Sequence, residues 1–388
     1  MGKREELEAK LIEHPGDVEL RMVYADLLQS TGDPRGELIV LSHRGNQADV
    51  DAYLAKHEDA LLGPLVRFKQ TFDHDSQPAF TWHLGFIKSA KIGYESNSAG
   101  DIDEDADECT ADLVVAALLQ HPSARLLEEL TITMNMLDDG MYFDSVVKAI
   151  AQYGAPALRS LRLGEFQHAG PGGVDNGYDY EISWSSLGDA SGVWKAVPRL
   201  ERLRIQLGLG GTSANGDADR IGTFDLPRLE HLEVVTGGMN ADCARSFAAA
   251  RLPAAKSIDL WFGSNNYGGD ATVKDLEPLF AGDGVPKLSH LGLMNAELAD
   301  DIVAALAPSK LLPRLSELSL AHGMMTDAGA QTIATHADAF KHLAQLDLSN
   351  NYLTSAGLAA VRGVCQVLSE EQREYDAGDD NRYVALAE

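Results

Sequence analysis

Three apolar positions, spaced as apolar-x-x-apolar-x-apolar, recur along the chain from residue 127 to residue 348. The last two positions of each copy alternate with other residues, which is typical of a short strand with one buried face. The middle positions of successive copies lie 26 to 42 residues apart, a length that predicts one strand and one return connection per copy. The eight clear copies are Leu127/Leu130/Ile132, Leu158/Leu161/Leu163, Leu200/Leu203/Ile205, Leu229/Leu232/Val234, Ala255/Ile258/Leu260, Leu288/Leu291/Leu293, Leu315/Leu318/Leu320 and Leu343/Leu346/Leu348.

The stretches between the predicted strands carry apolar residues at helical spacing, most clearly over 299–306, 328–334 and 356–361. A single strand–helix unit cannot bury its apolar side alone, so such units must stack on their neighbours. We therefore predict an α/β solenoid with a parallel sheet on one side and helices on the other. A degenerate copy, Ile87/Ala90/Ile92, predicts that the array covers residues 80–388 in about eight to nine repeats.

Residues 164–198 interrupt this period. The segment is rich in glycine and accounts for the longest step between copies, which predicts a surface insertion. The residues after the last helical stretch predict a C-terminal capping segment, because a solenoid needs its open ends covered.

The best copy reads Leu343-Ala-Gln-Leu-Asp-Leu-Ser-Asn-Asn-Tyr-Leu. With its asparagines at the turn, this copy resembles a leucine-rich repeat, and the period of about 28 residues with a full helix resembles the ribonuclease-inhibitor subclass. The resemblance implies a horseshoe with a concave parallel sheet and convex helices.

Residues 1–70 follow a different pattern. Helical periodicity over 5–12, 18–28 and 50–62, broken at His14-Pro-Gly and Gly32-Asp-Pro, predicts a helical N-terminal cap. The segment resembles the repeat-companion domain that precedes repeat arrays in bacteria such as myxobacteria and planctomycetes. The residues that carry this resemblance are Arg21, Tyr24, Ala25, Asp26, Gly32, Asp33, Pro34, Arg35, Gly36 and Glu37. Its charged residues predict internal ion pairs and helix caps, with a docking patch as the alternative.

The C-terminal half resembles an uncharacterised family of bacterial leucine-rich repeat proteins. The resemblance covers roughly residues 200–388 and is carried by 260–273, 291–300 and the closing 382–388. It implies a horseshoe fold and brings no activity, cofactor or catalytic residue with it.

Composition narrows the function. The chain has 32 basic and 59 acidic residues, a net charge of −27, which disfavours nucleic acid and anionic membranes and favours a protein partner with a basic surface. Three scattered cysteines predict neither a disulfide framework nor a zinc site. No apolar run is long enough to span a bilayer, and no signal region opens the chain, so we expect a cytoplasmic protein.

No catalytic motif is present in the sequence, so we predict no enzyme activity and no cofactor. Cys243 lies at the start of a predicted helix, where a thiol can become reactive, but a buried packing role is the favoured interpretation. The glycine-rich loop 263–270 can bind an anion, although a tight strand-to-helix loop with Asp270 as the helix cap is favoured.

An acidic stretch over 101–112 copies part of the spacing of a calcium loop. Its carboxylates are Asp101, Asp103, Asp105 and Asp112. The loop has Ala106 where the turn needs glycine and lacks the final glutamate, so we predict no metal site and keep calcium as the alternative.

The strand residues beside the leucines must point to the opposite, concave face. We predict that this face binds the partner, with Trp261 as the main aromatic anchor and Tyr267 on the rim. The predicted binding residues are Glu129, Thr131, Arg202, Arg204, His231, Glu233, Asp259, Trp261, His290, Met294, Glu317 and Asp347. Thr133, Gln206, Ser257, Gly292, Ser319, Gln345 and Ser349 are expected on the same face.

These observations predict a non-enzymatic scaffold that binds another protein through the concave face of its repeats. The alternative is an inhibitor or immunity-type regulator of an enzyme such as a basic nuclease or a toxin, because the repeat type and the net charge also suit that role.

Overall fold

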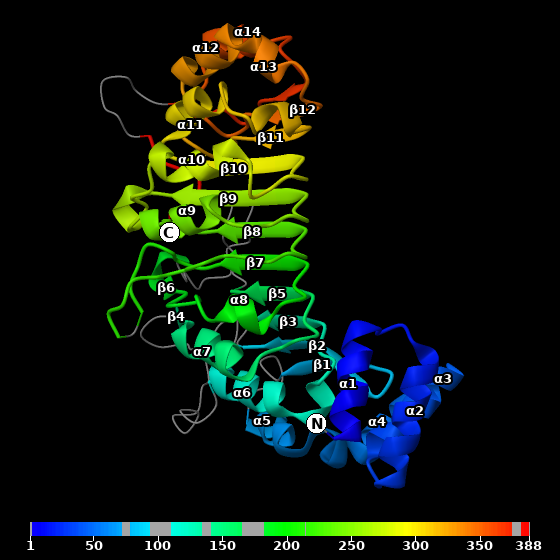
Figure 1. Ribbon diagram of the computed structural model, residues 1–388. Helices are drawn as coiled ribbons and strands as arrows, with labels where there is room; N and C mark the ends of the chain where they lie inside the picture. The colour runs from blue at the N-terminus through cyan, green and yellow to red at the C-terminus, as the bar shows by residue number, and fades with distance from the viewer. Residues whose placement is uncertain are drawn as a thin grey trace.

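The fold is described from a computed structural model of the chain, drawn in Figure 1. The structure describes residues 2–71, 78–93, 110–133, 141–164, 182–213, 215–374 and 382–387. Most of the acidic stretch 101–112 and residues 165–181 of the predicted insertion lie outside these ranges.

An 11-stranded sheet runs through the molecule in the order β1-β2-β3-β5-β7-β8-β9-β10-β11-β12-β13. From β2 onward every neighbouring pair is parallel. All eight predicted copies and the degenerate first copy form strands, and β13 adds one more. The strands are β2 (Phe86–Ile92), β3 (Glu129–Ile132), β5 (Ser160–Leu163), β7 (Arg202–Gln206), β8 (His231–Val235), β9 (Ser257–Gly263), β10 (His290–Ala296), β11 (Glu317–Ser319), β12 (Gln345–Asp347) and β13 (Val367–Leu368).

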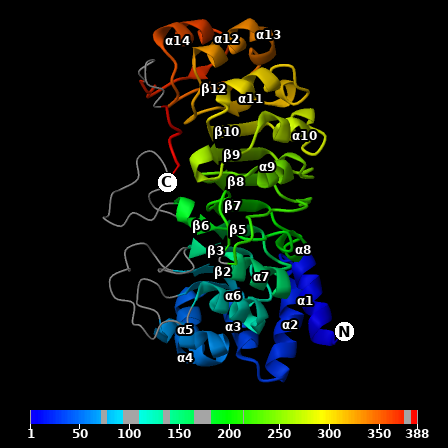
Figure 2. The ribbon, with the colours of Figure 1, turned by 90° about the vertical axis from the view of Figure 1, so that its left-hand side faces the viewer.

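Helices connect most consecutive strands and lie on one side of the sheet (Figures 1 and 2), whereas the described residues between β7 and β8 form turns and isolated bridges. Their apolar residues and the inward leucines of the strands form one continuous core that extends from Leu62 to Val361. The predicted solenoid of strand–helix units is therefore confirmed. The α-helices are α6 (Ala111–Gln120), α7 (Asp144–Tyr153), α8 (Val193–Ala196), α9 (Ala241–Ala248), α10 (Glu277–Ala281), α11 (Ala299–Leu306), α12 (Asp327–Thr335), α13 (Ala337–Phe340) and α14 (Ser355–Val361). Shorter 3-10 turns are η3 (Pro122–Ala124), η4 (Ile182–Trp184), η5 (Asn265–Tyr267), η6 (Val273–Leu276) and η7 (Leu312–Arg314).

The part of the predicted surface insertion that the structure describes is mostly core. Leu187, Val193, Trp194 and Val197 are almost fully buried because α8 packs against the sheet like the other helices. Ser185 and Ser186 form β6, which pairs with β4 (Met141–Tyr142) in a separate two-stranded sheet. The surface-insertion interpretation was therefore wrong for residues 187–197.

Five helices precede the parallel strands: α1 (Lys3–Glu13), α2 (Val18–Ser30), α3 (Pro34–Arg44), α4 (Gln47–Leu62) and, after the 3-10 turn η1 (Gly63–Leu65), α5 (Val66–Thr71). The periodicity analysis missed α3, which begins at Pro34 in the first helical position with Asp33 as its cap. The strand β1 (Ala79–His83) then pairs antiparallel with β2, a hairpin that the repeat pattern did not contain.

The first repeat strand is joined to the N-terminal helices by an aromatic side chain. Phe86 of β2 is 1% exposed and packs with Tyr24, Leu28 and Ile39 of α2 and α3. The rings of Tyr24 and Phe86 stack with their centroids 5.9 Å apart, and the Arg35 guanidinium lies over the Phe86 ring. The helices and the array thus share one hydrophobic cluster.

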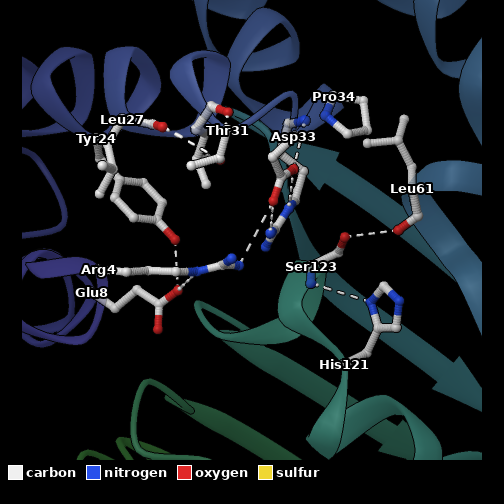
Figure 3. A network of polar contacts seen from close by, with 12 residues as sticks. Arg4, Glu8, Tyr24, Leu27, Thr31, Asp33, Pro34, Leu61, His121 and Ser123 are labelled. Atoms are coloured by element: carbon white, nitrogen blue, oxygen red, sulfur yellow. Dashed lines mark hydrogen bonds and ion pairs between the residues drawn. The ribbon is translucent and has the colours of Figure 1, made fainter. Parts of the chain in front are cut away.

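Figure 3 shows the polar contacts at this junction. The hydroxyl of Ser123 donates to the carbonyl of Leu61 at 2.7 Å, which ties the first repeat to α4. Arg35 is 4% exposed and pairs with Asp33. Burial alone would raise the pKa of Asp33, but the hydrogen bonds and charge of Arg35 outweigh it and lower that pKa. The Asp33–Arg35 pair and the Asp33 cap agree with the predicted internal role of these charges.

Phe86→Ala should destabilise the protein by about 3 to 5 kcal/mol, because it removes a fully buried ring from the junction. The measurement is chemical denaturation followed by circular dichroism. Phe80→Ala, in the half-buried first strand of the same hairpin, is the matched control and should cost clearly less. Equal losses of unfolding free energy in the two variants would contradict the prediction that Phe86 contributes more to stability than Phe80.

Candidate binding face of the sheet

The parallel register aligns the outward side chains of successive strands in rows. The Cα pairs Ser160–Arg202, Arg202–His231, His231–Ser257 and His290–Glu317 belong to one row. We name it the first row; its members are Glu129, Ser160, Arg202, His231, Ser257, His290, Glu317 and Gln345. The second row, two residues further along each strand, consists of Thr131, Arg162, Arg204, Glu233, Asp259, Gly292, Ser319 and Asp347.

Most of the predicted binding residues stand in these two rows. Arg202, His231 and Glu317 are exposed, and the other predicted binding residues in the two rows are half-buried. Gly292 and Ser319, which were expected on the same face, are buried. Sequence analysis did not name Arg162, although the copy Leu158/Leu161/Leu163 places it in the same position as Arg204. Its repeat position was the signal that could have found it.

Charges change sign along the rows. The arginines Arg162, Arg202 and Arg204 lie on β5 and β7, with His231 beside them on β8, whereas the carboxylates Glu233, Asp259, Glu317 and Asp347 lie on β8 to β12. The boundary is bridged by Arg204, whose Nε lies 3.4 Å from Oε2 of Glu233. The face therefore has a basic part and an acidic part within an acidic chain.

His290 is held between two carboxylates in the acidic part. Its Nε2 lies 2.8 Å from Oδ1 of Asp259, and its Nδ1 lies 3.0 Å from Oε2 of Glu317. Hydrogen bonding and charge from Asp259, then Glu317, outweigh burial and raise the pKa of His290 to about 9. Gly292 makes room for this arrangement, because a Cβ there would lie 2.3 Å from the Asp259 Oδ1. With a carboxylate at each ring nitrogen, neither nitrogen is free to activate a nucleophile.

A third outward position, two residues beyond the second row on the longer strands, is largely buried. Gln206 pairs in register with Val235, and Trp261 with Met294. Gln206 and Val235 are 2% and 4% exposed, and Trp261 and Met294 are half-buried. Thr133 is also buried in the third position, at 3% exposed, and Ser319 of the second row is 8% exposed. Thr133, Gln206 and Ser319 therefore lie on the predicted face of the sheet but offer little surface to a partner.

The chain's own C-terminal segment, residues 382–387, covers part of this third position. Figure 2 shows it, in red, running beside the sheet from the level of β12 toward β8. Asn295 binds the backbone of Leu386 twice: its Nδ2 donates to the carbonyl at 2.5 Å, and its Oδ1 accepts from the amide at 2.9 Å. The amide of Ala385 donates to the carbonyl of His322 at 3.0 Å. The segment therefore lies along the end of β10 and the corner that follows β11.

Trp261 is in contact with this segment. Leu386 forms a small apolar cluster with Ile182 and Val235, and Trp261 packs against that cluster. On its other side Trp261 stacks with His322, with ring centroids 5.2 Å apart. Much of its surface is thus used inside the molecule, and the role of an aromatic anchor for a partner stays a prediction.

Other residues singled out in the sequence have structural roles. Cys243 is fully buried, and burial raises its pKa to about 12, so its thiol stays protonated near neutral pH. In the loop 263–270, which includes the half-buried Tyr267, the amide of Asn265 donates to Glu297 at 3.3 Å, so a carboxylate of the chain already uses this donor. Asp270 accepts from the amide of Ala241 at 2.6 Å, and so contacts the start of α9 rather than capping the helix that follows it.

Within the described ranges, no three His, Cys, Asp or Glu side chains come together as metal ligands. The calcium alternative falls mainly on Asp101–Cys109, outside those ranges. Among the described residues, none of the helices combines the length and apolarity that crossing a bilayer requires.

Comparison with known proteins bears on the fold. The chain is similar to a protein from Bacteroides fragilis of known crystal structure, at 24% sequence identity and a TM-score of 0.58, over 74% of this chain and 76% of that one. An internalin from Listeria monocytogenes matches at 15% identity and a TM-score of 0.31, over 65% of this chain and 57% of that one. The TLR13–ssRNA13 complex matches at 15% identity and a TM-score of 0.34, over 74% of this chain and 40% of that one. Neither a family model nor a curated relative matches the sequence.

The parallel in-register strands, with a buried Leu or Ile at the middle position of all eight clear copies, decide the architecture. The chain has a leucine-rich-repeat-like fold. The likeness to the Bacteroides protein shows the fold alone, and the horseshoe curvature and the companion domain stay predictions.

The pKa of His290 gives a testable pH dependence. Because the pKa rises from about 6.5 in the unfolded chain to about 9 in the folded protein, the stabilisation is fully present below pH 6.5 and is lost as pH rises through 9. The wild type should therefore lose stability relative to His290→Gln over this window, as measured by thermal melting. A His290 ring that titrates near pH 6.5 in an NMR experiment would contradict this.

Asn295→Gly should release the C-terminal segment. Asn295 has a φ of +54°, which glycine adopts without strain, so the change removes the two side-chain bonds to Leu386 and leaves the corner intact. Backbone hydrogen exchange at Leu386 should accelerate by about tenfold or more. Asn350→Gly is the matched control: Asn350 also has a φ of +54°, but its side chain bonds His322 instead, so exchange at Leu386 should be unchanged.

Proposed function

We propose that this protein is a non-enzymatic scaffold that binds another protein through the first and second rows of its sheet. The observation that carries the proposal is the register, which places charged side chains of eight strands, β3, β5 and β7 to β12, side by side on one face. These rows lie beside the third position, part of which the chain's own C-terminal segment covers. Leucine-rich-repeat folds suit such a role, because stacked repeats present a large preformed surface with little ordering cost on binding.

The acidic part of the face selects the chemistry of the partner. Glu233, Asp259, Glu317 and Asp347 stand on four strands. Asp259 and Glu317 share one cation, His290, and Glu233 lies 3.4 Å from the Nε of Arg204. A basic surface on the partner complements these carboxylates, and the net charge of −27 accelerates the encounter. Trp261 and Met294 border this part and contribute through the surface that the C-terminal segment leaves open.

Two observations support a binding role over catalysis. His290 has both ring nitrogens engaged by carboxylates, and Cys243 is buried with its thiol protonated. The alternative, an inhibitor or immunity-type regulator of a basic nuclease or toxin, uses the same face and the same charge. The identity of the bound protein separates the two.

Glu317→Lys should weaken capture of the partner by about tenfold, because it places a repulsive charge in the first row, equivalent to about 1.4 kcal/mol. The measurement is affinity capture with quantitative mass spectrometry, followed by titration with the purified partner. Glu277→Lys is the matched control: it makes the same charge change at an exposed position on α10, and should bind like the wild type. A partner captured equally by both variants would show that the face is not the binding surface.

A further inference from the structure

The basic part of the face contradicts the overall charge of the chain. Arg162 on β5 pairs in register with Arg204 on β7, so two guanidinium groups stand side by side. Neighbouring strands lie about 4.8 Å apart, and like charges placed directly side by side across strands are destabilising. In a chain with 59 acidic and 32 basic residues, a cluster of three arginines on two adjacent strands is unusual. Because the arginines repel one another, the cluster does not serve to stabilise the fold.

The positive charges of this cluster are largely unneutralised. Neither Arg162 nor Arg202 forms an ion pair with any described residue. Arg204 has one carboxylate nearby, with its Nε 3.4 Å from Glu233, and this nitrogen has no hydrogen-bond partner within the described chain. Asp259, the register neighbour of Glu233, is bonded to His290 at 2.8 Å and to Ser257 at 3.3 Å. Donor groups of the arginines therefore remain available.

A hollow lies over these side chains. It has a volume of about 250 Å³ and is lined by Arg162, Arg202, Arg204 and His231 together with Ser160, Glu233, Ser257 and Asp259. Sites for drug-sized ligands have volumes of about 300 to 1,000 Å³. The hollow is thus suited to a single small group, and guanidinium groups bind planar oxyanions through paired, charge-assisted hydrogen bonds.

We propose that Arg162, Arg202, Arg204 and His231 form an oxyanion site that binds a carboxylate side chain from an acidic segment of the protein partner. This inference rests on the proposed function and adds the direction in which the partner lies along the sheet. The partner places its acidic segment over β5 to β8 and its basic surface over β9 to β12. A free anion is repelled by the net charge of −27, whereas a carboxylate held by neighbouring contacts has a high effective concentration at the site.

This direction sets the length of a suitable probe. From β7 to β11 the sheet advances four strand steps, about 19 Å, which an extended peptide covers in about six residues. The probe is a labelled peptide with glutamates at one end, lysines at the other and a glycine spacer of about six residues between them. Because its net charge is zero, the global field of the protein does not drive its binding. A peptide with lysines at both ends is the comparison.

The full-length double variant Arg162→Gln/Arg202→Gln should bind the bipolar peptide about tenfold or more weakly than the wild type. Its affinity for the all-lysine peptide should not fall, and its melting temperature should be equal or slightly higher, because a repulsion is removed. Arg251→Gln/Lys274→Gln is the matched control: it removes the same charge from exposed positions outside the rows and should behave like the wild type.

Bipolar-peptide binding within twofold of the wild type in the Arg162→Gln/Arg202→Gln variant would overturn the proposal. Calorimetric binding of inorganic phosphate to the wild type as tightly as the peptide would also overturn it, by assigning the cluster to a free oxyanion. These results are independent of Glu317→Lys and partner capture, so the carboxylate site can fail while the binding face stands.

Discussion

In-register stacking of parallel strands is the constraint on which the rest of this structure depends. Each repeat buries its leucines only against the same positions of its neighbours, as the pairs Leu161–Leu203, Leu203–Leu232 and Leu291–Leu318 show. Because side chains alternate along a strand, the same register fixes every outward residue in a row. A one-residue slip would move the leucines out of the core and the arginines into it, so the hydrophobic core also holds the charged rows in place.

The repeat pattern predicted the array well because alternation of apolar and polar residues within a few positions is enough to indicate a strand with one buried face. Leu343, Leu346 and Leu348 indicate a strand with one buried face wherever the chain goes, and all nine proposed copies became strands. Trp261 shows the limit of this reasoning. The alternation of strand residues correctly placed its side chain on the face opposite the leucines, but it did not predict that other parts of the chain pack over it. The cover comes from Leu386 and Ile182, residues distant in sequence, and no periodicity connects them to β9. Helix α3 was missed because Pro34 was interpreted as a break rather than as the first position of a helix.

The corners at the ends of the strands also repeat from one strand to the next, because they share the same backbone conformation. Asn295, His322 and Asn350 have φ values of +54°, +66° and +54° at the same position of three successive repeats. Such residues turn the chain sharply and leave carbonyls and side chains available beside the sheet. The C-terminal segment uses them: His322 accepts the amide of Ala385, and Asn295 binds both backbone groups of Leu386. The register therefore also explains why a short segment can run across the ends of successive strands.

The covered third position makes the binding face narrower and more polar than the alternation of strand residues implies. With Trp261 and Val235 under the C-terminal segment, the open rows contain mainly charged and hydroxyl side chains. Exposed ion pairs contribute little affinity, since they are screened and solvated. A partner that relies on these rows therefore gains its affinity from many aligned charge-assisted contacts and its specificity from their sign. In the proposed mode, a partner with acidic groups over β5 to β8 and basic groups over β9 to β12 complements both parts of the rows at once. The order of charges along the sheet, rather than its area, is then what we propose selects the partner.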